Sequence, residues 1–172
     1  MSRKLHLGGT VRVEGWEVFN AIPGEVVDHV GNANDLSRFT AGTFDEIYGS
    51  HILEHFSYQG ELPAVLAEWR RVLKPGGIIY VSVPDLDTLC RLLLEPKLNS
   101  QQRFHVMRML FGGQMDQWDY HKVGLNEMFL GGFLHQAGFS GIRRVKDLGI
   151  FDDTSAIVFM GVPISLNFIA FA

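Results

Sequence analysis

The chain has 172 residues, of which 47% are hydrophobic and 20% are charged, and its formal net charge is −4. This composition is typical of a globular protein with a buried core and excludes a disordered chain. The charge provides no basic face for nucleic acid, and a single cysteine excludes an internal disulfide. We therefore expect one domain that spans residues 1–172, with no nucleic-acid partner.

Short apolar runs in the first third of the chain predict β-strands. These strands are expected at residues 5–7, 16–19, 26–30 and 44–49. Residues 61–73 then carry apolar side chains at helical spacing, and Lys74-Pro75-Gly76-Gly77 ends that helix. Residues 78–83, IIYVSV, form a nearly continuous β-branched run, which is typical of a central parallel strand buried on both faces.

Helices and strands also alternate in the second half of the chain. Helices are expected at residues 85–94, 101–110 and 126–136, with Asp85 as the N-cap of the first. Strands are expected at residues 142–148 and 155–162, joined by a hairpin-like connection at residues 151–154. This order predicts an α/β fold with a mainly parallel sheet and an antiparallel C-terminal edge strand.

The two ends of the chain bear on its location. The first residues, MSRKLHLGG, lack the apolar stretch of a signal peptide. A membrane helix needs about 20 mostly apolar residues, but Pro163, Ser165 and Asn167 interrupt the apolar C-terminus. We therefore expect a cytoplasmic protein without a membrane span, whose C-terminus forms strands. A homodimer joined through an edge strand is a further expectation.

Polar residues follow two of the predicted parallel strands. Ser50 and His51 come directly after residues 44–49, and Asp85 comes after the next strand along the chain. In an open parallel sheet, ligands bind at these strand ends, so function is expected there. Asp85 is either a helix N-cap alone or also a carboxylate that faces the substrate.

A second candidate region is the aperiodic stretch at residues 112–122. It contains Trp118, Tyr120, His121 and two carboxylates. Long loops of this kind are often functional. The stretch is either a solvated connector or a lid that binds substrate.

Residues 51–55, HILEH, match the H-x-x-E-H pattern of inverted zinc peptidases. On a helix, His51 and His55 would share one face and could bind zinc as the centre of a hydrolase. Two other interpretations remain open. Glu54 and His55 would satisfy backbone groups at the start of a helix, or His51 alone would face a ligand. No metal is assigned from the sequence, because no third ligand stands out.

Several segments together resemble the class I S-adenosylmethionine-dependent methyltransferases, and more narrowly the methyltransferases of the type 11 domain family. The matching segments are LHLGGT at residues 5–10, Gly15-Trp16, FDEIYGSHILEHF, EWRRVLKPGG and VSVPDLDTL. The resemblance covers nearly the whole chain and implies a Rossmann-like methyltransferase sheet with S-adenosylmethionine as the cofactor. It carries over cofactor contacts to Gly8, Gly9, Asn20, Asn32, Ala33, Ser50 and His51.

The chain departs from the family pattern where the cofactor should be held. The family's Gly-Cys-Gly is Gly8-Gly9-Thr10 here, and Asn20 and Asn32 stand where the family has carboxylates. An amide has one acceptor oxygen, and losing a charge-assisted hydrogen bond costs about 1–3 kcal/mol. The first two strands are also too close for an ordinary crossover helix, so that helix is expected to be short or missing and the pocket more open.

The resemblance implies methyl transfer to a small-molecule acceptor, and we expect a sugar or lipid-linked acceptor because many relatives act in glycan pathways. If the acceptor atom is a hydroxyl oxygen, a base assists by removing its proton, and the candidates are His121, Asp85 and His51. The alternative is a degenerate, non-catalytic binding module that keeps the fold with a weakened cofactor site.

Overall fold

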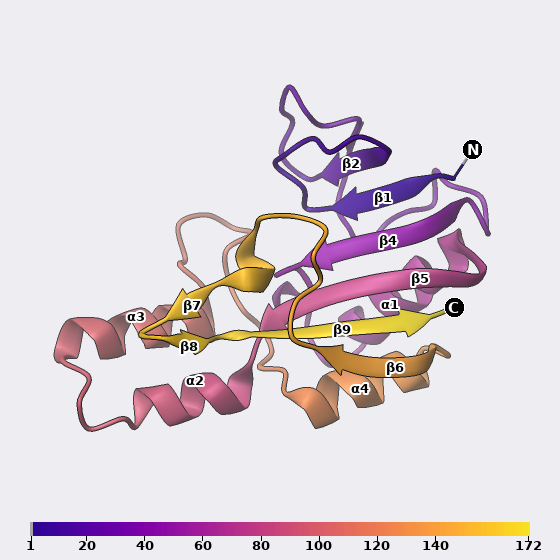
Figure 1. Ribbon diagram of the computed structural model, residues 1–172. Helices are drawn as coiled ribbons and strands as arrows, with labels where there is room; N and C mark the ends of the chain where they lie inside the picture. The colour runs from indigo at the N-terminus through magenta and orange to yellow at the C-terminus, as the bar shows by residue number, and fades with distance from the viewer. Residues whose placement is uncertain (1) are drawn as a thin grey trace.

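A computed structural model describes residues 2–172 (Figure 1). Its main sheet has seven strands in the order β3-β2-β1-β4-β5-β9-β6. The strands are β1 (Lys4–Leu7), β2 (Trp16–Asn20), β3 (His29–Val30), β4 (Phe44–Ser50), β5 (Leu73–Pro84), β6 (Ser140–Val145) and β9 (Ser165–Phe171). The remaining strands, β7 (Val158–Phe159) and β8 (Val162–Pro163), form a separate hairpin.

The helices follow the predicted positions closely. They are η1 (Leu53–His55), α1 (Glu61–Val72), α2 (Leu86–Leu93), α3 (Ser100–Phe111), α4 (Glu127–Gln136) and η2 (Thr154–Ala156). Asp85 caps α2, accepting a hydrogen bond from the Asp87 N–H, and Asn126 caps α4 in the same way through the Phe129 N–H. No helix of the described residues is both long and apolar enough to cross a membrane.

One face of the sheet packs against α1 and α4, which lie behind it in Figure 1. The buried residues of α1, spaced three and four apart, meet the strand residues that alternate inward. Trp69 of α1 and Leu134 of α4 are fully buried against Leu7 and Ile79 of the strands. This apolar layer is the main core and fixes the strand ends at which a site can form.

The connections before β4 contain no helix. Residues 8–15 and 21–28 join parallel neighbours through turns alone, and residues 31–43 lead from β3 to β4, which lies beyond β2 and β1 in the sheet, also without a helix. The prediction that the first crossover helix is short or missing is therefore confirmed, and the shortening extends to the next two connections.

The opposite face of the sheet is covered by the loop at residues 146–157, which crosses its front in Figure 1. Phe151 stacks on His6 of β1, with ring centroids 4.0 Å apart. The Tyr48 hydroxyl donates to the Asp153 carboxylate at 3.0 and 2.9 Å. This loop lies where the missing crossover helices would otherwise pack.

The predicted α/β fold with a mainly parallel sheet is confirmed, but the antiparallel strand is not at the edge. β9 pairs with β5 on one side and β6 on the other, both antiparallel. The physical reason is burial: Leu166, Phe168 and Ala170 are buried in β9, whereas β6 is mostly exposed. The expected dimer therefore has β3 or β6 as its available sheet edge, since both edges of β9 are occupied.

The prediction of a strand at residues 155–162 is wrong. This segment contains η2 and the short strand β7, and it turns at Met160 and Gly161, which both have positive φ. The strand that pairs with β6 is Ser165–Phe171. Local apolar composition is equally strong in both segments, so only the long pairing with β5 selects the later one.

Candidate functional site

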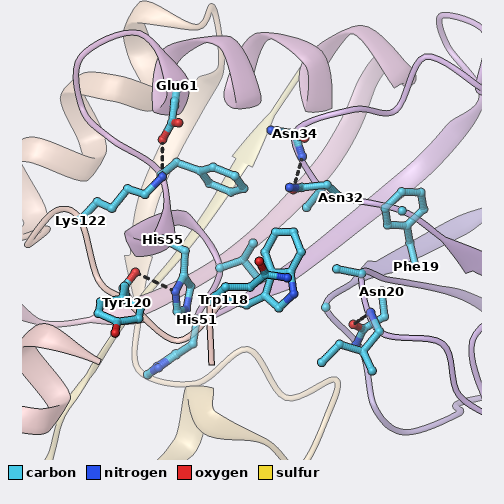
Figure 2. Close-up of a pocket in the computed structure, with 18 residues that line it drawn as sticks. Phe19, Asn20, Asn32, Asn34, His51, His55, Glu61, Trp118, Tyr120 and Lys122 are labelled. Atoms are coloured by element: carbon cyan, nitrogen blue, oxygen red, sulfur yellow. Dashed lines mark hydrogen bonds and ion pairs between the residues drawn. The ribbon is translucent and has the colours of Figure 1, made fainter. Parts of the chain in front are cut away.

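A pocket of about 300 Å³ opens at the carboxyl ends of β1, β2, β3 and β4 (Figure 2). On one side it is lined by residues of the strand ends, including Gly8, Asn20, Asn32 and Ala33. On the other side it is lined by residues of the 112–122 stretch, including Trp118 and Tyr120. The stretch therefore lines the pocket, as the lid interpretation predicts.

Asn20 supports the backbone around the pocket. Its amide nitrogen donates to the Gly9 carbonyl at 2.9 Å, and its amide oxygen accepts from the Ile22 N–H at 2.9 Å. The side chain therefore ties the loop after β1 to the turn after β2. A carboxylate at this position would have no proton to donate to Gly9.

Asn32 lies on the same side of the pocket as Asn20, after the neighbouring strand β3 (Figure 2). Its amide oxygen accepts from the Asn34 N–H at 3.2 Å, and no partner is recorded for its amide nitrogen among the described residues. The neighbouring Ala33 carbonyl accepts from the Trp69 indole N–H at 2.7 Å. The turn at residues 31–34 is thus anchored to the main core.

Two glycines at the pocket let the backbone pass close to neighbouring side chains. At Gly8, where φ is 71°, a Cβ would lie 2.7 Å from the Ile52 side chain. At Gly31, a Cβ would lie 2.6 Å from the Phe19 ring. At Gly8 the positive φ favours glycine, and at both positions a Cβ would require the neighbouring side chain to shift.

The residues present fit the nucleoside part of S-adenosylmethionine. Ala33 and Ile52 offer apolar surface, Asn32 offers a free amide donor, and Gly8 leaves room for close backbone approach. The pocket volume is at the lower end of the range for small-molecule sites, about 300–1,000 Å³.

Four of the predicted site residues lie outside the lining of this pocket, namely Gly9, Ser50, Asp85 and His121. Gly9 faces His6, since a Cβ there would meet the imidazole. Ser50 lies 2.9 Å from the Thr154 hydroxyl, at the loop that covers the other sheet face. Asp85 is 3% exposed; it caps α2, accepts from the Thr88 hydroxyl at 2.9 Å and pairs with Arg144 at 3.2 Å.

His51 and His55 line the pocket, but they do not share a helix face. His51 lies at the tip of β4 with φ 53°, and the only helix between the two is the three-residue η1. The helical arrangement that the H-x-x-E-H pattern requires is therefore absent from this segment. The structure instead brings His55 next to His121, with ring centroids 4.9 Å apart.

Glu54 lies at the centre of these histidines. Its side-chain oxygen Oε1 is 3.6 Å from His51 Nδ1 and 4.0 Å from His121 Nε2. Burial raises the pKa of Glu54 to about 8. Burial also lowers the pKa of His51 and of His121 to about 4, with a smaller effect from neighbouring histidines. At neutral pH both imidazoles are thus uncharged and carry a free lone pair.

Sequence reasoning missed the grouping of Glu54, His55 and His121. These side chains come from η1 and from the lid stretch, which meet because the Lys122 N–H donates to the Glu54 carbonyl at 2.8 Å. The two segments are far apart in sequence, and no local pattern signals their contact. A second cavity, of about 10 Å³, is bordered by Glu54 and His121.

Comparisons with known proteins agree with this fold. Residues 17–81 match the family model described as a methyltransferase domain. No curated protein compared with the chain matches it.

Solved structures match over almost the whole chain. A S-adenosylmethionine-dependent methyltransferase from Archaeoglobus fulgidus is 14% identical with a TM-score of 0.62, covering 99% of this chain and 86% of the other. One from Mesorhizobium loti is 14% identical with a TM-score of 0.61, covering 99% and 90%. A complex between the Haloferax volcanii Trm112 methyltransferase activator and a methyltransferase is 13% identical with a TM-score of 0.59, covering 99% and 82%.

At these identities the solved structures show the fold. Together with the family match, they confirm the predicted resemblance to class I methyltransferases. They also point to S-adenosylmethionine as the cofactor.

Proposed function

We propose that this chain, which has the fold of the class I S-adenosylmethionine-dependent methyltransferases, transfers a methyl group to a small-molecule, glycan or lipid-linked acceptor. One observation carries the proposal. A single pocket is lined both by the positions that the resemblance assigns to the cofactor and by aromatic residues of the lid. A cofactor and an acceptor would therefore meet in one pocket, as methyl transfer requires.

The cofactor would supply an electrophilic methyl group, and the chain's residues would position it. Asn32 and Ala33 would hold the adenine, and Gly8 would allow the backbone to approach. Trp118 and Tyr120 would pack against the acceptor from the lid side (Figure 2). The Lys122–Glu61 ion pair, at 2.9 Å, joins the lid to α1 and would hold it over the pocket.

Of the three candidate bases, His51 is the one in the pocket wall. His121 borders the smaller cavity with Glu54, and Asp85 is engaged by the α2 N-terminus and Arg144. We infer that His51 is the candidate base closest to the acceptor and that His121 acts only through Glu54. We also propose that the reaction takes place in the cytoplasm, as expected for a chain with a single cysteine that is free.

Calorimetry with S-adenosylmethionine and S-adenosylhomocysteine tests the proposal. Asn32→Asp is the sharper of two substitutions, because a carboxylate still accepts from the Asn34 N–H while gaining a second acceptor for the adenine amine. We expect it to tighten binding by about 5-fold or more. Asn20→Asp is the matched control, because it loses the bond to Gly9 and should give a smaller gain. Absence of binding heat at millimolar S-adenosylmethionine and S-adenosylhomocysteine would refute the proposed methyltransferase activity.

The rival function is a binding module that keeps the fold without catalysis. It is favoured by the two Asn20 hydrogen bonds, which occupy its amide, and by the absence of Ser50 from the pocket lining. A module of this kind would bind neither cofactor nor product, even in the Asn32→Asp variant. The two functions therefore give opposite calorimetric results.

A further inference from the structure

Glu54 is a buried carboxylate that lacks a hydrogen-bond partner. Glu54 is 1% exposed, and neither of its side-chain oxygens has a hydrogen-bond partner among the described residues. Burying an ionised carboxylate without compensation costs several kcal/mol. The group is therefore either protonated or neutralised by a cation at this position.

Imidazole nitrogens surround this carboxylate. Glu54, His55 and His121 each present one ligand atom, and these atoms lie within 4.8 Å of one another. His51 Nδ1 also approaches Glu54 Oε1, at 3.6 Å. The side chains come from the tip of β4, from η1 and from the end of the lid stretch, so the fold itself brings them together.

The hydrogen bonds of His55 assign its proton. Its Nδ1 lies 3.1 Å from the Tyr120 carbonyl, which only accepts, so Nδ1 carries the hydrogen (Figure 2). Its Nε2 is then an unprotonated lone pair. A backbone carbonyl that fixes the tautomer of a histidine in this way is the usual outer partner of a metal-binding imidazole.

His51 is fixed by a similar chain. The Ser165 hydroxyl donates to the Thr154 carbonyl at 2.7 Å, so its oxygen accepts from His51 Nε2–H at 3.0 Å. His51 Nδ1 is then a lone pair that faces Glu54 Oε1. Two acceptors that face each other at 3.6 Å repel, unless a proton or a cation lies between them.

We propose that Glu54, His55 and His121 bind a divalent transition-metal cation, with His51 beside it. Two imidazoles and one carboxylate suit Zn²⁺, Co²⁺ or Mn²⁺ rather than Mg²⁺ or Ca²⁺, which prefer oxygen ligands alone. The adjoining cavity of about 10 Å³ has room for one water-sized species. Ligands of tetrahedral zinc lie about 3.3–3.6 Å apart, so small side-chain movements would close the set.

The position of the site suggests its use. His51 and His55 also line the larger pocket, so a cation held here would be in the wall that faces the acceptor. A divalent cation lowers the pKa of a bound hydroxyl and orients it. This role rests on the proposed methyl transfer, whereas the binding of the cation does not.

The test begins with the full chain freed of metal by a chelator. Zn²⁺ is added in a calorimeter, and Co²⁺ is added while its visible absorption is followed. We expect one ion per chain and an absorption band typical of low-coordinate Co²⁺ with nitrogen ligands. Glu54→Gln and His121→Ala should each weaken binding of Zn²⁺ by at least about 10–100-fold. His135→Ala, on the exposed side of α4, is the matched control and should leave binding unchanged.

Folding is checked for each variant by circular dichroism and thermal unfolding. If His121→Ala fails to fold, Glu54→Gln keeps the test decisive, because it preserves the shape of the side chain. The inference is overturned if the folded wild type does not bind Zn²⁺ stoichiometrically. It is also overturned if Glu54→Gln binds Zn²⁺ as tightly as the wild type. In that case Glu54 is simply protonated.

Cofactor calorimetry on the same metal-free sample separates this inference from the proposed function. Binding of S-adenosylhomocysteine without binding of Zn²⁺ would overturn the cation site alone. Binding of Zn²⁺ without binding of the cofactor or its product would overturn methyl transfer alone.

Discussion

Replacing His6 by phenylalanine should flatten the pH dependence of the protein's stability. His6 is 4% exposed, its Nδ1 has no recorded partner, and its ring lies between Tyr48 and Phe151. Burial lowers the pKa of His6 to about 4, against an opposing effect of Asp153. His6 is therefore protonated near pH 6.5 in the unfolded chain but only near pH 4 in the folded chain.

The sign and size of the effect follow from this difference. Because the folded pKa lies below the unfolded pKa, the contribution of neutral His6 is fully present above about pH 6.5 and is lost as the pH falls toward 4. Between pH 8 and pH 5 the loss amounts to about 2 kcal/mol of unfolding free energy. A phenylalanine cannot titrate, so the variant should lose about that much less than the wild type over the same interval.

Urea denaturation at pH 8 and at pH 5 measures this difference. His6→Leu is the matched control, because leucine also cannot titrate but stacks less well on Phe151. Both variants should show the same reduced pH dependence while differing in absolute stability. His51 and His121 titrate alike in all three proteins and cancel from the comparison. If His6→Phe loses as much stability as the wild type at pH 5, the assignment of a buried neutral imidazole is wrong.

Three further substitutions test how the pocket and its supports are held. Trp69→Phe removes the indole donor to the Ala33 carbonyl and leaves a cavity, so it should lower the unfolding free energy by about 2–4 kcal/mol. Its control is Trp118→Phe, which should change the unfolding free energy little because Trp118 is 44% exposed. Tyr48→Phe removes the hydroxyl that donates to Asp153 and should cost about 1–3 kcal/mol in the same urea assay, with the exposed Tyr58→Phe as its control. Gly112→Ala would push a Cβ into the Asp119 backbone, whereas Gly60→Ala meets nothing within 4 Å although φ is positive at both positions. Proteolysis within residues 112–122 should therefore quicken in the first variant alone, and equal rates would show that the lid does not depend on this contact.

Much of the fold could be predicted because its signals are local. The IIYVSV run forms the C-terminal half of β5, the longest strand, and the apolar spacing of residues 61–73 predicts α1 almost to the residue. The missing crossover helix also followed from chain length, since residues 8–15 are too few to form one. In each case the deciding physics is backbone propensity, periodic burial or reach, which neighbouring residues determine.

The place of the antiparallel strand could not be read in this way. Residues 155–162 and 165–171 are both apolar, and only the second finds seven partners on β5 and a cover for both faces. Strand selection is a competition for long-range pairing, so it depends on segments far away in the chain. The position of the loop that covers the sheet in place of helices could not be predicted either. It depends on contacts of Phe151 with His6 and of Asp153 with Tyr48, which lie far apart in the sequence.

The sequence by itself determined the methyltransferase-like architecture and the strand ends at which a pocket would form. It also identified the residues there, Asn20, Asn32 and His51, all of which line the pocket. Only the tertiary structure decided that the Asn20 amide braces the backbone and that His121 lies beside Glu54 and His55. The reason is physical. Propensity and periodicity act between neighbours in the chain, whereas the burial of Glu54 and the convergence of its histidines exist only once η1 and the lid stretch pack together.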